Sequence, residues 1–234
     1  VEAAAVRFGW PVYWSAYLVS RDSDIYTYSD LEGRSWAYPD SGSTSGFIVP
    51  SVELEAAGIT PGENIEAGGH GQAVLAVYNG EADFATVYFS PPLTPNTSWN
   101  YGDLPEPFDL TVDEAFVTDE GRLFVGDTRI LDARSAVAEQ APDVVDALRI
   151  LRISSAIPND TMAFGPDFPA ELRTQIYDAL VAFSDTEAWA DSALGSDAGY
   201  NWTTLTTIGD STFDSVRLQF EVLGLTEEDI FADD

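Results

Sequence analysis

Residues 35–58, SWAYPDSGSTSGFIVPSVELEAAG, place a strand, a glycine-rich loop and a helix in direct succession. The aromatic residues of 35–39 are typical of a buried strand, and Gly58 closes the helical pattern that follows the loop. Between them, GSTSG at 42–46 holds three hydroxyl side chains at the point where the helix begins. The first turn of a helix has unpaired N–H groups and a partial positive charge, so this stretch predicts a site for an oxyanion.

The chain on either side alternates strands and helices in the same way. Residues 12–20 (VYWSAYLVS) and 82–89 (ADFATVYF) are rich in aromatic and β-branched residues and predict buried strands. Further helices and strands are expected in the segments 70–82, 141–154, 161–168, 169–185 and 210–224. This alternation predicts an α/β protein with parallel-rich sheets.

Residues 91–129 interrupt the alternation. They are dense in Pro, Asn and Asp, and they run into RLFVGDTRIL (122–131), which predicts a β-hairpin. We interpret this segment, the excursion, as an insertion at about 89–130 on a core that otherwise alternates strand and helix.

The composition excludes several classes of partner. The chain has 40 acidic residues against 10 basic ones, all of them arginine, and a net charge of −30. Nucleic acids and anionic membrane surfaces both require clustered Lys or Arg, so neither is an expected partner. No run approaches the roughly 20 apolar residues that a membrane span needs, so membrane insertion by this chain is not expected either. A strongly acidic surface without lysine suggests adaptation to salty extracellular surroundings.

An acidic chain can still hold an anion at the loop. The net charge acts at long range and is screened over about 8 Å at physiological salt, whereas amide and hydroxyl donors act at contact distance. The loop lacks the Gly-Lys-Ser/Thr ending of a nucleotide-binding P-loop, and the chain contains no lysine at all.

Four stretches in order carry a family resemblance: YWS (13–15), DSGSTSGFIVP (40–50), GGHGQAVLAVYNGEADFAT (68–86) and SSAIPNDTMAF (154–164). Together they closely resemble the phosphate, phosphite and phosphonate substrate-binding proteins of ABC importers. The resemblance implies a two-lobed, type II periplasmic-binding-protein-like α/β fold that binds its ligand in an interlobe cleft and needs no cofactor. It also implies an extracytoplasmic location, a lipid or membrane anchor in the full-length protein, and an ABC permease as partner.

The resemblance also implies a domain plan. Residues 1–20 would form a strand and crossover of lobe one, 21–156 would form lobe two with its insertion, and 157–234 would return to lobe one. Family members usually begin with a further segment of lobe one, so we expect lobe one to be incomplete here, or to be completed by another chain or segment.

Ligand-binding residues follow from the same motifs, position by position. The family's ligand-binding tyrosine, loop hydroxyls, histidine and aspartate match Tyr13, Ser43, Thr44, Ser45, His70 and Asp160. Trp14 is a further candidate for the cleft wall. Where aminoalkylphosphonate binders place a Glu, this chain has Ser90, which favours a ligand without an amine.

Elementary chemistry supports these roles. His70 is the only histidine, and beside an oxyanion its protonated form would make a charge-assisted hydrogen bond. Asp160 is unusual at an anion site. It could accept from the P–OH of a monoprotonated ligand, orient a neighbour, or simply form a turn after Asn159.

Three other functions are alternatives to this one. A phosphate-ester hydrolase would need a metal cluster or an activated nucleophile. One His, no Cys and no GxSxG elbow argue against an enzyme, and no metal site is expected. A ligand-binding sensor module would use the same binding chemistry as a transport protein. A binder of another small anionic solute is the third alternative, although the number of hydroxyls favours a tetrahedral oxyanion.

Overall fold

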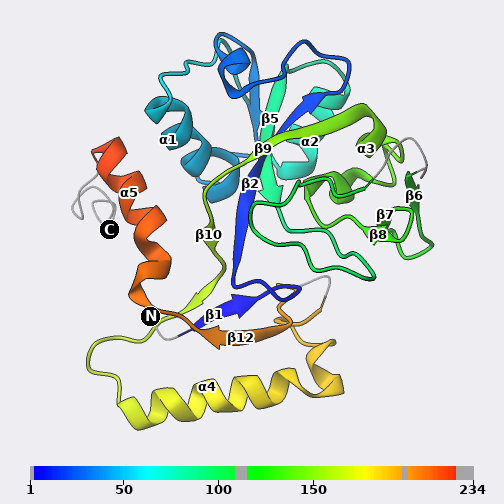
Figure 1. Ribbon diagram of the computed structural model, residues 1–234. Coiled ribbons are helices and arrows are strands. Elements are labelled where there is room, and N and C mark those ends of the chain that lie inside the picture. Colours follow the sequence, from blue (N-terminus) through cyan, green and yellow to red (C-terminus); the bar gives the residue numbers. More distant parts are fainter. Residues whose placement is uncertain (1–2, 109–114, 197–199, 225–234) are drawn as a thin grey trace. The chain divides into compact units, whose positions relative to one another are not determined.

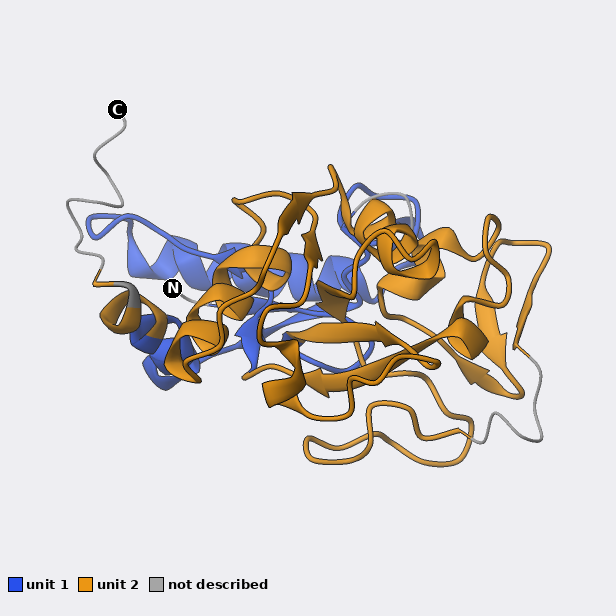
Figure 2. Cartoon of the chain, turned by 90° about the horizontal axis from the view of Figure 1, so that it is seen from above, with its two compact units in different colours: residues 1–13, 156–218 blue, residues 14–155, 219–234 orange. Residues whose placement is uncertain are grey.

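The computed structural model describes residues 3–108, 115–196 and 200–224 of the chain. The chain divides into two compact units, coloured separately in Figure 2. Unit 1 comprises Val1–Tyr13 and Ala156–Leu218, and unit 2 comprises Trp14–Ser155 and Gln219–Asp234. The chain therefore passes between the units after Tyr13, after Ser155 and after Leu218.

Unit 2 is built on a mixed sheet (Figure 1). Its strands lie in the order β9 (Leu148–Ile153), β2 (Val12–Ser20), β5 (Phe84–Phe89), β3 (Trp36–Tyr38) and β4 (Asn64–Glu66). β3 runs parallel to both β4 and β5, whereas β2 is antiparallel to β5 and β9. Parallel pairing is thus found in the three strands that are joined through helices, because parallel neighbours need a crossover connection. The other described strand pairs are antiparallel, so the sheets are mixed rather than parallel-rich.

The helices of unit 2 connect these strands along the chain. They are η1 (Tyr28–Leu31), η2 (Thr44–Ile48), α1 (Val49–Ala56), α2 (His70–Tyr78), η3 (Ala133–Val137) and α3 (Val144–Ala147). α1 ends before Gly58, whose φ of +68° lies in the left-handed region that glycine adopts most easily. A core cluster buries Tyr17 and Phe84 from the sheet against Leu54 from α1. These apolar contacts hold the glycine-rich stretch of 35–58 onto the sheet.

The excursion carries a small antiparallel sheet of its own. It consists of β6 (Ala115–Val117), β7 (Leu123–Val125) and β8 (Thr128–Arg129). β7 and β8 form the hairpin predicted for residues 122–131, with Gly126 at a φ of +54° in the turn.

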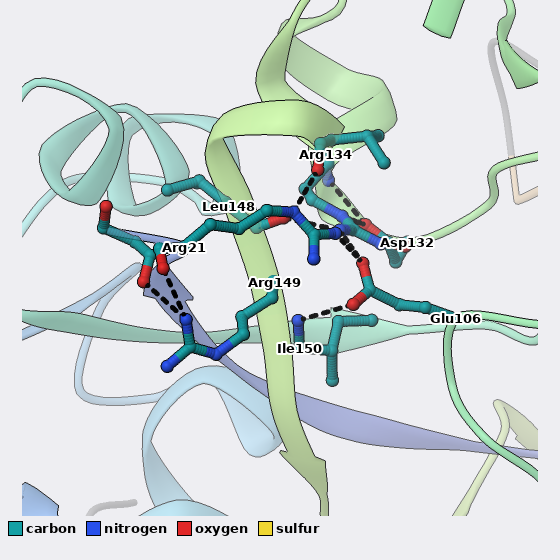
Figure 3. Close-up of polar contacts among 9 residues, drawn as sticks. Arg21, Glu106, Asp132, Arg134, Leu148, Arg149 and Ile150 are labelled. Atoms are coloured by element: carbon teal, nitrogen blue, oxygen red, sulfur yellow. Dashed lines mark hydrogen bonds and ion pairs between the residues drawn. The ribbon is translucent and has the colours of Figure 1, made fainter. Parts of the chain in front are cut away.

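A buried ionic cluster fastens the excursion to unit 2 (Figure 3). Glu106 Oε1 accepts from Arg21 at 2.8 Å and from Arg134 at 2.6 Å. Arg134 has a side chain with no exposed surface, and it also meets both carboxylate oxygens of Asp132 at 2.9 Å. Burial alone would lower the pKa of Arg134, but the charges of Asp132 and Glu106 outweigh it and raise that pKa. The guanidinium is therefore firmly charged and fully compensated.

Unit 1 has a smaller sheet, in the order β11 (Thr161–Met162), β1 (Ala3–Val6) and β12 (Thr204–Thr207), with all pairs antiparallel. β10 (Ile157–Pro158) pairs with the first residues of β2. The helices of unit 1 are α4 (Ala170–Ser184), η4 (Glu187–Trp189) and η5 (Asp210–Phe213), and α5 (Asp214–Leu223) begins in unit 1 and ends among the residues of unit 2. Ala3, Trp189 and Leu205 form its buried core.

One predicted element of unit 1 is shorter than expected. The strand predicted for 161–168 is limited to Thr161 and Met162. A turn follows at Pro166, which has no N–H to donate to a sheet and so ends regular pairing. Across the described residues, no helix is both long and apolar enough to cross a bilayer.

Candidate functional site

Three of the predicted site segments share one edge of the unit 2 sheet. The hydroxyl loop, Gly42–Gly46, follows β3, His70 follows β4, and Ser90 follows β5. Because these three strands are parallel neighbours, their carboxyl ends meet at the same edge. In open α/β sheets this edge is where ligands bind.

The hydroxyl loop presents donors at the start of a helical run. Ser43 is the N-cap of η2, and its Oγ accepts from Gly46 N at 3.1 Å. The amides of Thr44 and Ser45 lie in the first turn, and among the described residues they donate to no backbone group outside the helix. Thr44 is exposed, whereas Ser45 is only 3% exposed. The first-turn amides and the exposed Thr44 hydroxyl thus lie together at the start of the helical run.

Close packing fixes the conformation of the hydroxyl loop. A Cβ added to Gly46 would lie 2.3 Å from Pro39 Cδ, so only glycine fits there. The carbonyl of Gly46 accepts a short hydrogen bond from Thr86 Oγ1, which in turn accepts from Trp36 Nε1 at 2.7 Å. Thr86 and Trp36 are buried on β5 and β3. The sheet therefore holds the loop through a chain of satisfied polar groups.

His70 brings a second helix start to the same place. It is the first residue of α2, and its Nδ1 accepts from the amide of Tyr88 at 3.3 Å. A neutral ring that accepts at Nδ1 carries its proton on Nε2. Nε2 lies 3.5 Å from Ser43 Oγ, so the ring edge and the loop hydroxyl are neighbours.

The charge state of His70 differs from the expectation for a bound anion. Burial lowers its pKa from 6.5 to about 4, against the opposing charge of Asp40. In the structure as it stands the ring is therefore neutral at pH 7, and it offers one N–H rather than a cation. A bound oxyanion at Nε2 would raise that pKa, because it favours the charged ring.

Two further predicted residues lie in unit 1. Tyr13 is half-buried on β2, where it pairs with Ile157 of β10. Asp160 is not a lone carboxylate: its Oδ2 accepts from Arg7 at 2.8 Å and from Trp202 Nε1 at 3.0 Å. The charge of Asp160 is thus compensated by Arg7, which reduces the repulsion that its carboxylate would exert on an anion.

Trp14 and Ser90, the two weaker candidates, lie in unit 2. Trp14 is 1% exposed, stacks on Tyr101 with ring centroids 5.9 Å apart, and meets Trp99 edge-on at 5.2 Å. Both partners belong to the excursion, which therefore covers this tryptophan. Ser90 is half-buried just beyond the end of β5.

Sequence reasoning missed Arg7, Thr86 and the steric role of Gly46. Arg7 could have been singled out because basic residues are so few in this chain. Nothing in the sequence pattern marks Thr86, which lies within a buried strand, or the approach of Pro39 to Gly46. The described residues contain no group of three or more His, Cys, Asp or Glu side chains that could hold a metal ion.

Several solved structures have a fold similar to that of this chain. XAC2383 from Xanthomonas citri bound to ATP matches with a TM-score of 0.60 at 14% identity, over 95% of this chain and 70% of that one. A binding protein component of an ABC phosphonate transporter from Pseudomonas aeruginosa gives 0.57 at 16% identity, over 99% and 68%. PhnD1 from Prochlorococcus marinus in complex with methylphosphonate gives 0.51 at 13%, over 96% and 72%. The fold is that of the periplasmic binding proteins.

The family follows from the sequence. The family model described as "ABC transporter, phosphonate, periplasmic substrate-binding protein" matches residues 1–212. The chain belongs to this family of substrate-binding proteins, which confirms the resemblance inferred from the four motifs. The family is one of transport proteins rather than enzymes.

A curated relative is also similar. The phosphate-import protein PhnD of Mycolicibacterium smegmatis is 35% identical over 86 residues, a match that covers 32% of this chain and 27% of that protein. The chain thus matches only about a quarter of that relative, and it covers roughly 70% of the solved chains.

Proposed function

We propose that this protein captures a phosphorus oxyanion, namely phosphate, phosphite or a simple alkylphosphonate, and delivers it to the permease of an ABC importer. The observation that supports this best is the 3.5 Å approach of His70 Nε2 to Ser43 Oγ, beside the first-turn amides of Thr44 and Ser45. Donors from the starts of two helices meet there, and a tetrahedral anion needs several donors at contact distance.

The proposed ligand contacts are Ser43, Thr44, Ser45, His70, Tyr13 and Asp160. The chemistry of Asp160 fits a protonated P–OH, because its carboxylate accepts hydrogen bonds and its charge is already paired with Arg7. Ser90 supplies no carboxylate to pair with a ligand amine, which supports a ligand that has no amine. We place the protein outside the cytoplasm, in the periplasm or at the cell surface, with a membrane anchor on the full-length protein.

Isothermal titration with phosphate, phosphite, methylphosphonate, aminoethylphosphonate and sulfate tests the proposal. We expect heat of binding with at least one of the first three, and weaker binding of aminoethylphosphonate and sulfate. The absence of binding to every phosphorus oxyanion would refute the function. Tight binding of aminoethylphosphonate alone would refute the inference from Ser90.

The variant Thr44→Ala tests the site itself. Thr44 is exposed, so we expect removal of its hydroxyl to change the free energy of unfolding only slightly. A hydrogen bond to a charged group is worth about 1.5–3 kcal/mol, so we expect the dissociation constant for the best ligand to rise about tenfold or more. Ser41→Ala, on the exposed approach to the loop, is the matched control and should bind as the parent protein does.

A further inference from the structure

Glu53, on the inward side of α1, engages both of its carboxylate oxygens. Oε1 accepts from the amide of Ser155 at 2.8 Å. Oε2 accepts from the hydroxyl of Tyr17 at 3.1 Å and lies 3.2 Å from Arg152 Nη2. The side chain is only 17% exposed, so these contacts are partly shielded from water. A carboxylate with three donors on two oxygens is held in one orientation.

The donors around Glu53 are themselves ordered. The guanidinium of Arg152 lies 4.2 Å from the ring centre of Tyr28 and 5.2 Å from that of Tyr17. Tyr17 has no exposed surface, and burial, followed by the charge of Glu53, raises the pKa of its hydroxyl, which therefore stays a donor. Glu53 thus joins α1 to β2 and β9 through groups that have little freedom to move.

Ser155 is the residue at which the chain leaves unit 2, because unit 1 resumes at Ala156. The preceding residue, Ser154, forms two hydrogen bonds with β2. Ser154 N donates to Ser15 O at 2.9 Å, and Ser15 N donates to Ser154 Oγ at 2.9 Å. The hydrogen bond from Ser155 N to Glu53 extends these contacts by one residue, to the point where the chain leaves unit 2.

α1 also carries the hydroxyl loop, since η2 and α1 form one helical run from Thr44 to Ala56. Glu53 lies eight residues after Ser45 in this run, which is π-helical over Thr44–Ile48 and α-helical over Val49–Ala56. A displacement of Glu53 can pass along this continuous backbone to the hydroxyl loop. A constraint on Glu53 is therefore also a constraint on the first-turn amides.

We propose that Glu53 is a positioning residue for anion binding: it ties the helix that carries the Thr44 and Ser45 amides to the point where the chain leaves unit 2. This inference rests on the proposed function of the hydroxyl loop. Glu53 does not touch the anion. Its contribution is the placement of donors that do, and of Ser155 relative to them.

The first test is a double-mutant cycle with methylphosphonate, or with whichever oxyanion binds the parent protein best. Glu53→Gln keeps the volume but has one acceptor oxygen, so at least one donor loses its partner. We expect about fivefold weaker binding, and an effect in combination with Thr44→Ala smaller than the product of the single effects. Glu55→Gln, on the exposed side of the same helix, is the control and should combine multiplicatively with Thr44→Ala. Equal affinities for Glu53→Gln and Glu55→Gln would overturn the proposal.

The second test needs no ligand, so it separates this inference from the proposed function. Amide hydrogen exchange is compared between the parent protein, Glu53→Gln and Glu55→Gln. We expect faster exchange at Ser155 and at Thr44–Gly46 in Glu53→Gln alone, with unchanged exchange at Leu18 and Val19 in the core of β2. Unchanged exchange at the loop amides would overturn the inference, whether or not an oxyanion binds. If no oxyanion binds but the loop amides exchange faster in Glu53→Gln, the proposed ligand is refuted, whereas the positioning of the loop by Glu53 is supported.

Discussion

At the scale of single residues, Gly46 decides the conformation of the hydroxyl loop. Its missing side chain admits Pro39, whose Cδ would lie 2.3 Å from an added Cβ. In Gly46→Ala the loop must shift, and the donors of Ser43 and Ser45 shift with it. We expect titration to show at least tenfold weaker binding of the best oxyanion, because a misplaced charge-assisted hydrogen bond loses about 1.5–3 kcal/mol.

A control substitution at another glycine separates this effect from a general effect of replacing glycine by alanine. At Gly165 an added Cβ meets no atom within 4 Å. Gly165→Ala should therefore bind like the parent protein. Parent-like affinity in Gly46→Ala would show that the loop can adapt, and that its observed geometry is not required.

The lowered pKa of His70 predicts a pH dependence of stability. Burial lowers that pKa from 6.5 in the unfolded chain to about 4 in the fold, so between these values the unfolded chain binds the extra proton. The contribution of His70 to stability is complete above about pH 6.5 and is lost as the pH falls towards 4. Relative to His70→Gln, the parent protein should therefore lose on the order of 2 kcal/mol of unfolding free energy between pH 7 and pH 4.

Urea denaturation of the two proteins at a series of pH values measures this difference, since the many carboxylates are common to both and cancel. A difference that stays constant from pH 7 to 4 would mean that the ring is not held neutral by burial. Repeating the series with the oxyanion bound should give a smaller loss of unfolding free energy between pH 7 and pH 4, because the anion favours the charged ring and so raises the pKa of His70.

At the scale of elements, the excursion depends on the buried cluster shown in Figure 3. Removing one carboxylate leaves the unexposed guanidinium of Arg134 short of compensation. Breaking a buried ion pair in this way typically costs about 3–5 kcal/mol, and we expect Asp132→Ala to lower the urea midpoint accordingly. Asp24→Asn, at an exposed ion pair of the same unit, is the control and should leave the midpoint unchanged. Equal midpoints for the two variants would show that the cluster is dispensable.

Elements with a strong local pattern could be predicted from sequence. β2, β3, α1, α2, β5 and α4 each combine aromatic, β-branched or helical apolar patterns with clear ends, and the structure confirms them. β1 and β4 could not be predicted in the same way. β1 consists of AAAV, and its partner strands β11 and β12 lie more than 150 residues away in the sequence. Such pairing is a property of the whole fold, not of the segment.

The residues of the candidate site also fall into two groups, one that the local sequence predicts and one that it does not. Ser43, Thr44, Ser45 and His70 stand in local motifs, and the parallel order of β3, β4 and β5 brings them to one edge. Arg7 reaches Asp160 across 153 residues, and Thr86 reaches Gly46 across 40, so neither contact leaves a mark in the local sequence. Physical reasoning from sequence therefore predicted the donors more completely than the groups that hold them.

At the scale of the whole molecule, net charge opposes the compact state. The chain carries a charge of −30, and at least six of its ten arginines already sit in ion pairs with carboxylates. Most of the negative charge is therefore uncompensated within the molecule, and folding brings it closer together. Added salt should relieve this repulsion, because the screening length falls from about 30 Å at 0.01 M to about 3 Å at 1 M.

We therefore expect the thermal midpoint and the yield of refolding to rise steeply between 0.01 M and about 0.5 M NaCl and to level off above that, as screening becomes short-ranged. KCl should act equally, since screening depends on ionic strength, whereas sucrose at matched osmolality should not reproduce the steep early rise. The same salt should speed association of an anionic ligand, because long-range repulsion from the protein slows encounter while contact donors are little affected. Stability that is constant from 0.01 to 0.5 M NaCl would mean that the acidic surface carries no penalty for folding, and the inferred adaptation to salty surroundings would fall with it.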